Sequence, residues 1–267
     1  EQTSRAHYGP DNTADLYEDE KKLALLRNEE NITLFLWHRA NNVQTQKNEI
    51  KSIIIQDILS GQRKKLSARY FADCTGDGSV GYLAGSDSDI TVNNHMGRCN
   101  LWNIKETDSE VSFPRCPWAF DLYDKPFPGR EKNPGQYGTG ITKLGGWYWE
   151  SGFNHHPVKD GEYIRDTNFR AMYGAWDCLK NKDKVYQNYK LNWAAHISGK
   201  RESRRLMGDI ILSKEKLLES EYFDDACVPA TWSIDLHLPH KDYIKGFKND
   251  AFISKAHYTQ YPRPYWV

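Results

Sequence analysis

The sequence has few cysteines, and they are not arranged as in a disulfide framework or a zinc site. The five cysteines are odd in number and widely scattered, and no C-x-x-C pair occurs. Zinc ribbons and redox dithiols need such pairs, and small disulfide-stapled domains need a dense, even set. The adjacent pair His155-His156 has no third ligand nearby in the sequence. We therefore expect no metal site and no disulfide framework.

The sequence also lacks a charge imbalance and a long apolar run. Its 36 basic and 36 acidic residues cancel, so nothing in the charge indicates a nucleic-acid or membrane-surface partner. No apolar run approaches the roughly 20 residues of a membrane-spanning helix. The start, "EQTSRAHYGPDN", has neither a methionine nor the layout of a signal peptide. We expect a cut or processed end, and the sequence indicates no compartment.

Aromatic residues are abundant. The 267 residues, enough for one large domain or two modest ones, include nine tryptophans and sixteen tyrosines. Residues from about 90 to 163 are rich in glycine, proline and aromatics and show few clean periods, which is typical of an inserted, loop-rich region. We expect part of this aromatic content to line a pocket or an interface.

The first part of the chain predicts a short surface helix and then a β-meander. Strand-like runs at residues 32–45, 49–59 and 64–75 are joined by short turns, which indicates antiparallel neighbours. The third run ends in "YFADCT", which is apolar on both faces and predicts a strand that enters a covered sheet. A helix is expected to start near Ser79.

The later part of the chain predicts a long helix and a strand. Aromatic and aliphatic residues at helical spacing indicate a helix over 165–197 with a stripe facing the core. The stripe consists of Phe169, Met172, Tyr173, Trp176 and Leu179, and the spacing repeats at Tyr186, Tyr189, Trp193 and Ile197. The segment "SIDLHLPH" (233–240) follows as a strand.

The segment "FADCTGDGSVGYLAG" (71–85) is the first candidate site. Gly76 and Gly78 permit close backbone approach, Thr75 offers a hydroxyl, and Asp77 offers a carboxylate. A turn before a helix presents free N–H groups that favour anionic or hydroxyl-rich ligands. The pattern fits a nucleotide-type ligand, and it equally fits a plain turn in which Asp77 caps the helix.

The segment "GKRESRRLMGD" (199–209) is the second candidate site. Arg201, Arg204 and Arg205 lie within five residues, just before an apolar stretch. A run of charges is often a solvated face. An arginine that points inward needs an anion, since a guanidinium keeps its charge when buried. Glu202 and Asp209 would serve some of these arginines, and the others would be left for a ligand.

Together these segments resemble a family of FAD-dependent oxidoreductases. Members carry "D-A-T-G-D-G-D-x-A-Y-L-A-G" and later "R-E-S-R-R-x-x-G-D-Y-x-L", which stand here as "ADCTGDGSVGYLAG" (72–85) and "RESRRLMGDIIL" (201–212). The strand at 233–240 looks like the family's "G-I-D-I-H" strand. The resemblance covers roughly residues 20 to 267.

The resemblance implies an α/β (α+β) fold that is part of a flavoprotein. Residues 1–90 would belong to the FAD-binding domain with its meander, residues 91–230 would form an inserted substrate or cap region, and residues 231–267 would return toward the FAD domain. The cofactor would be FAD. Its adenosine and pyrophosphate part would lie beside Thr75, Gly76, Asp77 and Gly78.

The resemblance also implies roles on the substrate side. A small-molecule substrate would give a hydride equivalent to the flavin, and His237 would accept a proton with Asp235 as its orienting partner. Arg201, Arg204 or Arg205 would clamp a substrate carboxylate or stabilise negative charge on the reduced flavin. Trp147 and Trp149 would line the substrate, together with Tyr148 between them.

Two departures from the family pattern limit these expectations. No "G-x-G-x-x-G" turn precedes the first motif, and the family's later "A-G-R" segment is missing. We therefore expect an interior piece of a larger flavoprotein, inactive alone, whose partner is the remainder of the same polypeptide.

An aromatic platform for a sugar is the alternative interpretation. The stretch "GGWYWESGF" (145–153), with Trp102, Trp118 and Trp176, would then belong to a carbohydrate-binding or polysaccharide-processing module. The long helix expected over 165–197 fits such a module poorly, because sugar platforms usually lie on compact all-β scaffolds.

Overall fold

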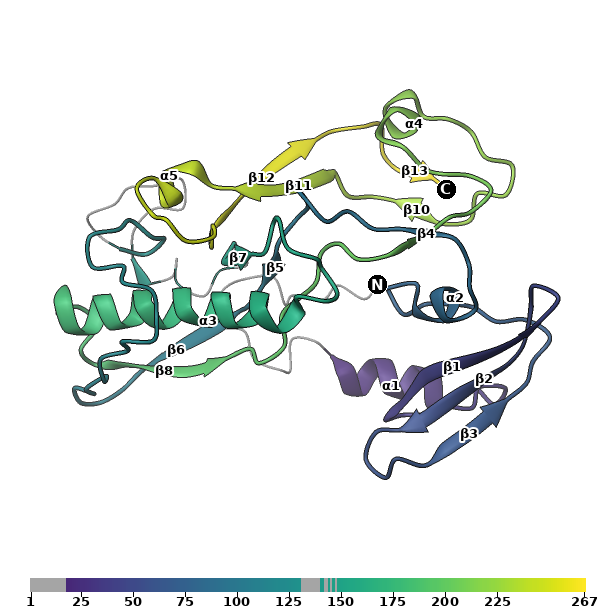
Figure 1. Cartoon of the computed structure of the whole chain (residues 1–267), viewed down its shortest axis with the longest axis horizontal. Coiled ribbons are helices and arrows are strands. Elements are labelled where there is room, and N and C mark those ends of the chain that lie inside the picture. Colours follow the sequence, from purple (N-terminus) through teal and green to yellow (C-terminus); the bar gives the residue numbers. More distant parts are fainter. Residues whose placement is uncertain (1–17, 131–139, 142–143, 145, 147) are drawn as a thin grey trace. The chain divides into compact units, whose positions relative to one another are not determined.

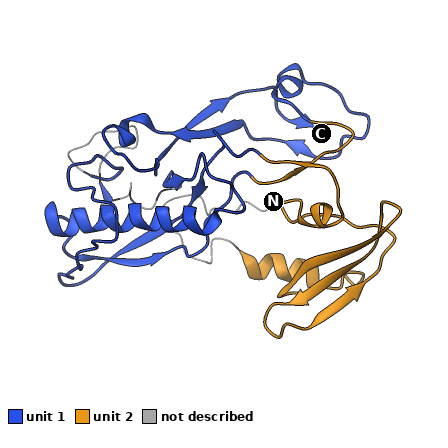
Figure 2. Ribbon diagram, viewed as in Figure 1, with its two compact units in different colours: residues 1–16, 91–202, 212–267 blue, residues 17–90, 203–211 orange. Residues whose placement is uncertain are grey.

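The computed structural model describes residues 18–130, 140–141, 144, 146 and 148–267. These residues form two compact units (Figure 2). Unit 1 contains described residues of 91–202 and 212–267, and unit 2 contains residues 18–90 and 203–211. Unit 2 is therefore discontinuous in sequence, since its last segment follows most of unit 1.

Figure 1 labels most elements of the two units. The helices are α1 (Asp19–Arg27), α2 (Ser79–Leu83), α3 (Gly161–Asp177), the π-helix η4 (Cys178–Lys182), α4 (Lys214–Glu219) and α5 (Lys241–Ile244). The strands are β1 (His38–Gln46), β2 (Glu49–Asp57), β3 (Arg63–Leu66), β4 (Ser88–Asp89), β5 (Arg98–Cys99), β6 (Trp102–Glu106), β7 (Glu150–Ser151), β8 (Tyr189–Ala194), β9 (Arg205–Leu206), β10 (Pro229–Ala230), β11 (Ile234–Pro239), β12 (Ser254–Thr259) and β13 (Tyr265–Trp266).

Unit 2 begins with the surface helix α1 and a three-stranded antiparallel meander in the order β1-β2-β3. The β1–β2 turn consists of Lys47 and Asn48, both with positive φ (50° and 63°), as a two-residue hairpin turn requires. The next turn is held by the Asp57 carboxylate, which accepts a hydrogen bond from Leu59 N at 2.8 Å. The predicted helix and meander are confirmed.

The prediction of a third strand that runs to residue 75 is wrong. β3 ends at Leu66, and residues 67–78 form no strand. No strand in the described part of the chain pairs with these residues, and the Tyr70 side chain is largely exposed. An apolar stretch becomes a strand only where a partner satisfies its backbone groups. The helix expected from Ser79 does form, as α2.

Unit 1 is built around the long helix α3 and a cluster of buried aromatic rings. Met172, Trp176 and Leu179 are almost completely buried in this cluster, as the helical spacing predicts. The ring of Trp102 from β6 meets those of Trp149 and Trp176 edge-on, with centroids 5.3 and 6.3 Å away. Edge-to-face packing of this kind stabilises a core beyond simple area burial.

The prediction that the helix continues to residue 197 is wrong. The helical segment ends at Lys182, and Lys184 and Tyr186 have positive φ, which a helix does not tolerate. The buried Lys180 ammonium donates to the carbonyls of Tyr186, Gln187 and Tyr189, each at 2.9 Å. The chain then runs as β8, which pairs with β6. The pairing of β8 with β6 therefore determines the conformation of this segment, although its aromatic residues are spaced as in a helix.

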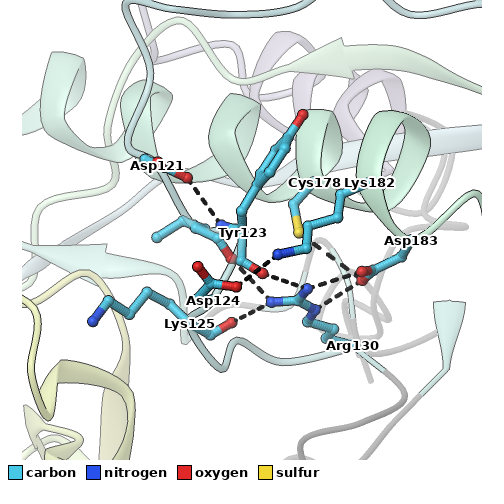
Figure 3. A network of polar contacts seen from close by, with 9 residues as sticks. Asp121, Tyr123, Asp124, Lys125, Arg130, Cys178, Lys182 and Asp183 are labelled. Atoms are coloured by element: carbon cyan, nitrogen blue, oxygen red, sulfur yellow. Dashed lines mark hydrogen bonds and ion pairs between the residues drawn. The ribbon is translucent and has the colours of Figure 1, made fainter.

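A second buried cation holds the loop that precedes the undescribed residues 131–139. The Arg130 guanidinium makes a bidentate pair with Asp183, at 2.8 and 2.9 Å (Figure 3). It also donates to the carbonyls of Leu122, Tyr123 and Lys125. This saturated network joins the loop to the end of η4 inside unit 1.

The end of the chain contributes an antiparallel pair of strands to unit 1. β11 pairs with β12 along their full length, with Asp235 opposite Tyr258 and His237 opposite Ala256. The predicted strand over 233–240 is confirmed as β11. Within the described residues, no helix has the length and apolar character to cross a membrane.

Candidate functional site

The first candidate region lies in unit 2 and is called the turn centre here: residues 73–82 with Arg204 and Leu206. Its backbone is held by two side chains. The Asp73 carboxylate accepts from Gly81 N at 2.9 Å and from the Thr75 hydroxyl at 2.7 Å. That hydroxyl in turn accepts from Ser79 N at 3.0 Å. The turn therefore supplies hydrogen-bond acceptors for several of its own backbone N–H groups. The Thr75 hydroxyl takes part in these bonds.

The pKa of Asp73 reflects these bonds. Burial by itself raises the pKa of this carboxyl, but the hydrogen bonds from Gly81 and Thr75 outweigh burial, and the pKa lies below its ordinary value. Asp73 is therefore a carboxylate that fixes the start of α2. Asp77 does not cap the helix, because the N-cap is Gly78, which has left-handed backbone angles and no side chain.

The two glycines of the predicted ligand turn lie in different surroundings. Gly76 has φ +75°, and a Cβ at this position would meet no atom within 4 Å, so the backbone is open there. Gly78 has φ +58°, and its Cβ would lie 2.9 Å from the Leu206 side chain. At Gly81 a Cβ would lie 2.4 Å from the same side chain. Leu206, from the arginine-rich segment, therefore covers Gly78 and Gly81.

Arg204 joins the arginine-rich segment to the turn. Its Nη1 donates to the Asp77 carbonyl at 3.0 Å, and its guanidinium lies 4.1 Å from the centroid of the Tyr82 ring. Stacking on an aromatic ring is a favourable cation–π contact. Among the described residues no carboxylate pairs with Arg204. The neighbouring Arg205, by contrast, pairs with Asp89 at 2.8 Å on the surface.

The second candidate region lies in unit 1 and is called the Glu150 centre: Glu150, Arg201, Asp235, His237 and Tyr258. β7 places Glu150 opposite Cys99 of β5, and the Glu150 side chain is completely buried. The Glu150 carboxylate accepts from Arg201 Nε at 2.7 Å. It also lies within 2.9 and 3.0 Å of His237 Nδ1. A buried carboxylate requires partners of this kind.

The other side of the His237 ring faces Asp235. His237 Nε2 lies 3.2 Å from Asp235 Oδ1, since residues i and i+2 of a strand share a face. The His237 side chain is 1 % exposed and that of Asp235 is 20 % exposed. Asp235 is therefore the more accessible member of the pair.

Tyr258 and Cys99 border this cluster. Burial and the Asp235 carboxylate raise the pKa of the Tyr258 phenol, so its hydroxyl keeps its hydrogen. Burial and the Glu150 carboxylate also raise the pKa of the Cys99 thiol well above its ordinary value. A thiol held protonated in this way is a poor nucleophile.

The structure divides the predicted site residues between the two regions. Arg204 lies at the turn centre with Thr75, Gly76, Asp77 and Gly78, whereas Arg201, Asp235 and His237 lie at the Glu150 centre. Arg205 forms a surface ion pair in unit 2. Trp147 lies outside the described residues, and Trp149 is buried in the aromatic core. The roles given to all these residues stay predictions.

Three of the rings proposed for the aromatic platform of the alternative interpretation lie in the core, and Trp147 lies outside the described residues. Trp102, Trp149 and Trp176 are buried in the core of unit 1 and expose no face for a sugar. Trp118 is half exposed, but its neighbour is Tyr173 at 5.0 Å. Trp102, Trp149 and Trp176 belong to one buried cluster that also contains residues of α3 and β6.

Asp73, Glu150 and Tyr258 were not predicted from the sequence as residues of a functional site. Asp73 stands two residues before Thr75, which is the spacing of a side-chain turn, so this signal was present. Glu150 lies in an aromatic stretch and gives no local signal. Tyr258 is identified only by its register opposite Asp235.

The comparisons with known proteins give a family. Residues 8–265 match the family described as FAD dependent oxidoreductase. The chain belongs to the FAD dependent oxidoreductase family. No curated protein and no solved structure matches the chain.

The donor set of the turn centre fits the phosphate-bearing part of FAD, the cofactor that the family name implies. Arg204 is a guanidinium without a carboxylate partner among the described residues, held beside the turn by Asp77 and Tyr82. The backbone at Gly76 is open to an approaching group. The Asp77 N–H already donates to the Thr75 hydroxyl at 3.4 Å, and the Asp73 carboxylate repels anions, so the fit is limited to Arg204 and the Gly76 backbone.

Proposed function

We propose that the chain is part of an FAD-dependent oxidoreductase that takes a hydride equivalent from a small-molecule substrate. FAD would supply the hydride-accepting chemistry when bound. The turn centre would hold the cofactor through Arg204 and the backbone of Gly76. The remainder of the same polypeptide would complete the cofactor site.

The observation that carries this proposal is the arrangement of the second family motif. Arg204 lies against the first motif, and Arg201 lies against Glu150 beside His237. Each arginine is therefore held in place by specific contacts rather than spread over a solvated face. Placed guanidinium groups of this kind bind anionic groups or stabilise developing negative charge.

The Glu150 centre would handle the proton that leaves the substrate. His237 and Asp235 lie 3.2 Å apart and together form an acid–base pair. Arg201, whose side chain is 30 % exposed, would orient a substrate carboxylate or another anionic group near this pair.

Flavin content tests the proposal. The 267-residue chain and the longest product that its gene encodes are purified side by side and examined for the absorbance of oxidised flavin. We expect the longer product to be yellow and to release FAD on denaturation. A colourless longer product that takes up no added FAD contradicts the proposal.

Substrate oxidation is tested on the flavin-containing product. Mixing it without oxygen with a panel of alcohols, amines and 2-hydroxy acids is expected to bleach the flavin with one class. Arg204→Ala is expected to lower flavin content, with Arg205→Ala as the matched control because Arg205 pairs with Asp89 on the surface.

A further inference from the structure

His237 cannot itself be the first group that a substrate meets. Its side chain is 1 % exposed, and carboxylates lie on both sides of its ring. A proton acceptor must come within hydrogen-bond distance of the group that loses the proton. The roles of its two neighbours, Glu150 and Asp235, therefore decide what the histidine does.

Glu150 fixes the position of the hydrogen on the ring. Both Glu150 oxygens lie within 3.0 Å of His237 Nδ1, and a carboxylate only accepts hydrogen bonds. Nδ1 therefore carries a hydrogen that it donates to Glu150. Glu150 is completely buried and is also bonded to Arg201, so it cannot turn away from the ring without also giving up its ion pair with this partly exposed guanidinium.

Asp235 then faces the acceptor side of the ring. In a neutral imidazole whose Nδ1 carries the hydrogen, Nε2 presents a lone pair. Here Nε2 lies 3.2 Å from Asp235 Oδ1. Two acceptor atoms at this distance repel each other unless a proton lies between them. A proton that arrives on Asp235 relieves this repulsion.

We propose that Glu150 is a positioning residue that makes the His237–Asp235 pair a proton acceptor, with Asp235 as the group that meets the substrate. This inference rests on the proposed function. The proton that leaves a substrate O–H or N–H goes to the Asp235 carboxylate and is shared with His237 Nε2. FAD, when bound, would supply the chemistry that accepts the hydride equivalent.

Tyr258 supports this assignment from the neighbouring strand. It is directly opposite Asp235 in the β11–β12 pair, and its phenol keeps its hydrogen because its pKa is raised. Its side chain thus shares a face of the strand pair with Asp235 and offers a hydrogen-bond donor. Arg201 provides a cation at the same cluster. A substrate with an anionic group next to its oxidised carbon matches this set of donors.

The ring hydrogens of His237 provide the test. In the 267-residue chain labelled with ¹⁵N-histidine, ¹H–¹⁵N spectra show which ring nitrogen carries hydrogen, and the loss of a signal in His237→Gln assigns it. We expect hydrogen on Nδ1 in the wild type. Glu150→Leu removes the acceptor and is expected to move the hydrogen to Nε2, whereas Glu150→Gln keeps an acceptor and is expected to keep it on Nδ1.

A second variant keeps the test valid if Glu150→Leu does not fold. Asp235→Asn replaces an acceptor with an amide that can donate to Nε2, so we expect a neutral ring with hydrogen on Nδ1 alone. Asp250→Asn is the matched control, because Asp250 contacts His155 Nε2 at 3.0 Å and not His237. It is expected to leave the His237 signals unchanged.

The inference is overturned by a wild-type ring that carries its hydrogen only on Nε2. It is equally overturned if a folded Glu150→Leu chain leaves the Nδ1 hydrogen in place. These spectra need no flavin. A colourless full-length product together with the expected spectra would refute the oxidoreductase proposal and not the role of Glu150 in fixing the histidine.

Discussion

The turn centre and the Glu150 centre are held together by different forces. At the turn centre, Asp73 and Thr75 bond to backbone groups within eight residues of themselves, and most of the atoms are accessible. At the Glu150 centre, a buried carboxylate joins Arg201 and His237, which lie 51 and 87 residues away in the sequence. The turn centre is therefore held by local hydrogen bonds, whereas the Glu150 centre forms only when distant parts of the chain fold together.

This difference determines how each region responds to change. Removing one local hydrogen bond from an exposed turn leaves water to replace it, so the cost is small. Removing one member of a buried charged cluster leaves its partners without compensation, and the cost is large. We therefore expect substitutions in the Glu150 centre to have larger effects than those in the turn centre.

Asp235→Asn should have the largest effect, on the rate of flavin reduction. If Asp235 receives the substrate proton, its loss should slow flavin bleaching by about 10²–10⁴-fold. Stopped-flow absorbance of the flavin-containing product, mixed with the most reactive compound of the panel, measures this rate. Asp250→Asn is the control, and equal rates in the two variants would remove Asp235 from proton transfer.

Glu150→Ala should have the largest effect on stability. The variant leaves the buried His237 and the Arg201 guanidinium without their shared anion, at a cost of about 3–5 kcal/mol. Urea unfolding of the chain, followed by tryptophan fluorescence, measures the free energy of unfolding. Glu162→Ala, on the exposed side of α3, should leave it unchanged. Similar values for the two variants would contradict the importance of the buried cluster.

Arg204→Ala should weaken cofactor binding in the complete protein. A charge-assisted hydrogen bond is worth about 1.5–3 kcal/mol, which corresponds to a loss of FAD affinity of roughly tenfold or more. Fluorescence titration of the apoprotein with FAD measures this affinity. Arg204→Lys keeps the charge but not the stacking on Tyr82, and we expect it to recover part of the affinity. Unchanged binding in Arg204→Ala would exclude this arginine from the cofactor site.

Gly81→Ala should destabilise unit 2 by about 1–3 kcal/mol, because its Cβ would lie 2.4 Å from Leu206 Cδ1. Amide hydrogen exchange in α2 and the β4–β9 pair measures the local effect. In the double variant Gly81→Ala/Leu206→Ala the clash is removed, so the two changes should be strongly non-additive. Additive effects would mean that Leu206 does not pack on this glycine.

Asp73→Asn should have a small, pH-dependent effect. The pKa of Asp73 is lowered in the folded chain, so its contribution to stability is present above the ordinary aspartate pKa of about 3.9 and is lost as the pH falls through the lowered value. The protection factor of the Gly81 amide, which is its intrinsic exchange rate divided by its observed rate, should fall in the wild type between about pH 5 and pH 2.5. It should respond less to pH in the variant. An identical pH dependence would contradict this role of Asp73.

The sequence predicted elements whose signals are local. The short turn between the first two strands, the surface helix α1 and the buried stripe of α3 follow from short patterns, and the structure confirms them. The extension of β3 to residue 75 and of the helix to residue 197 failed because strand pairing decides both regions. Periodicity alone cannot identify the partner of a strand.

The same limit applies to the candidate sites. Proximity of the two motifs was expected, and Arg204 does contact Asp77. The buried carboxylate that holds Arg201 and His237 was not expected, because Glu150 lies in a stretch of aromatic residues with no pattern of its own. A buried ionic cluster of this kind can be identified only once the pairing of distant strands is known.

The discontinuity of unit 2 has a consequence for the order in which the chain matures. Leu206 covers Gly81, and β9 pairs with β4, so unit 2 is complete only when residues 203–211 are available. During synthesis from the N-terminus, the meander and α2 emerge more than a hundred residues before these partners. Gly78 and Gly81 at the start of α2 therefore stay uncovered by Leu206 until the residues of the unit 1 aromatic core have been translated. Contacts between such distant residues form late and slow folding.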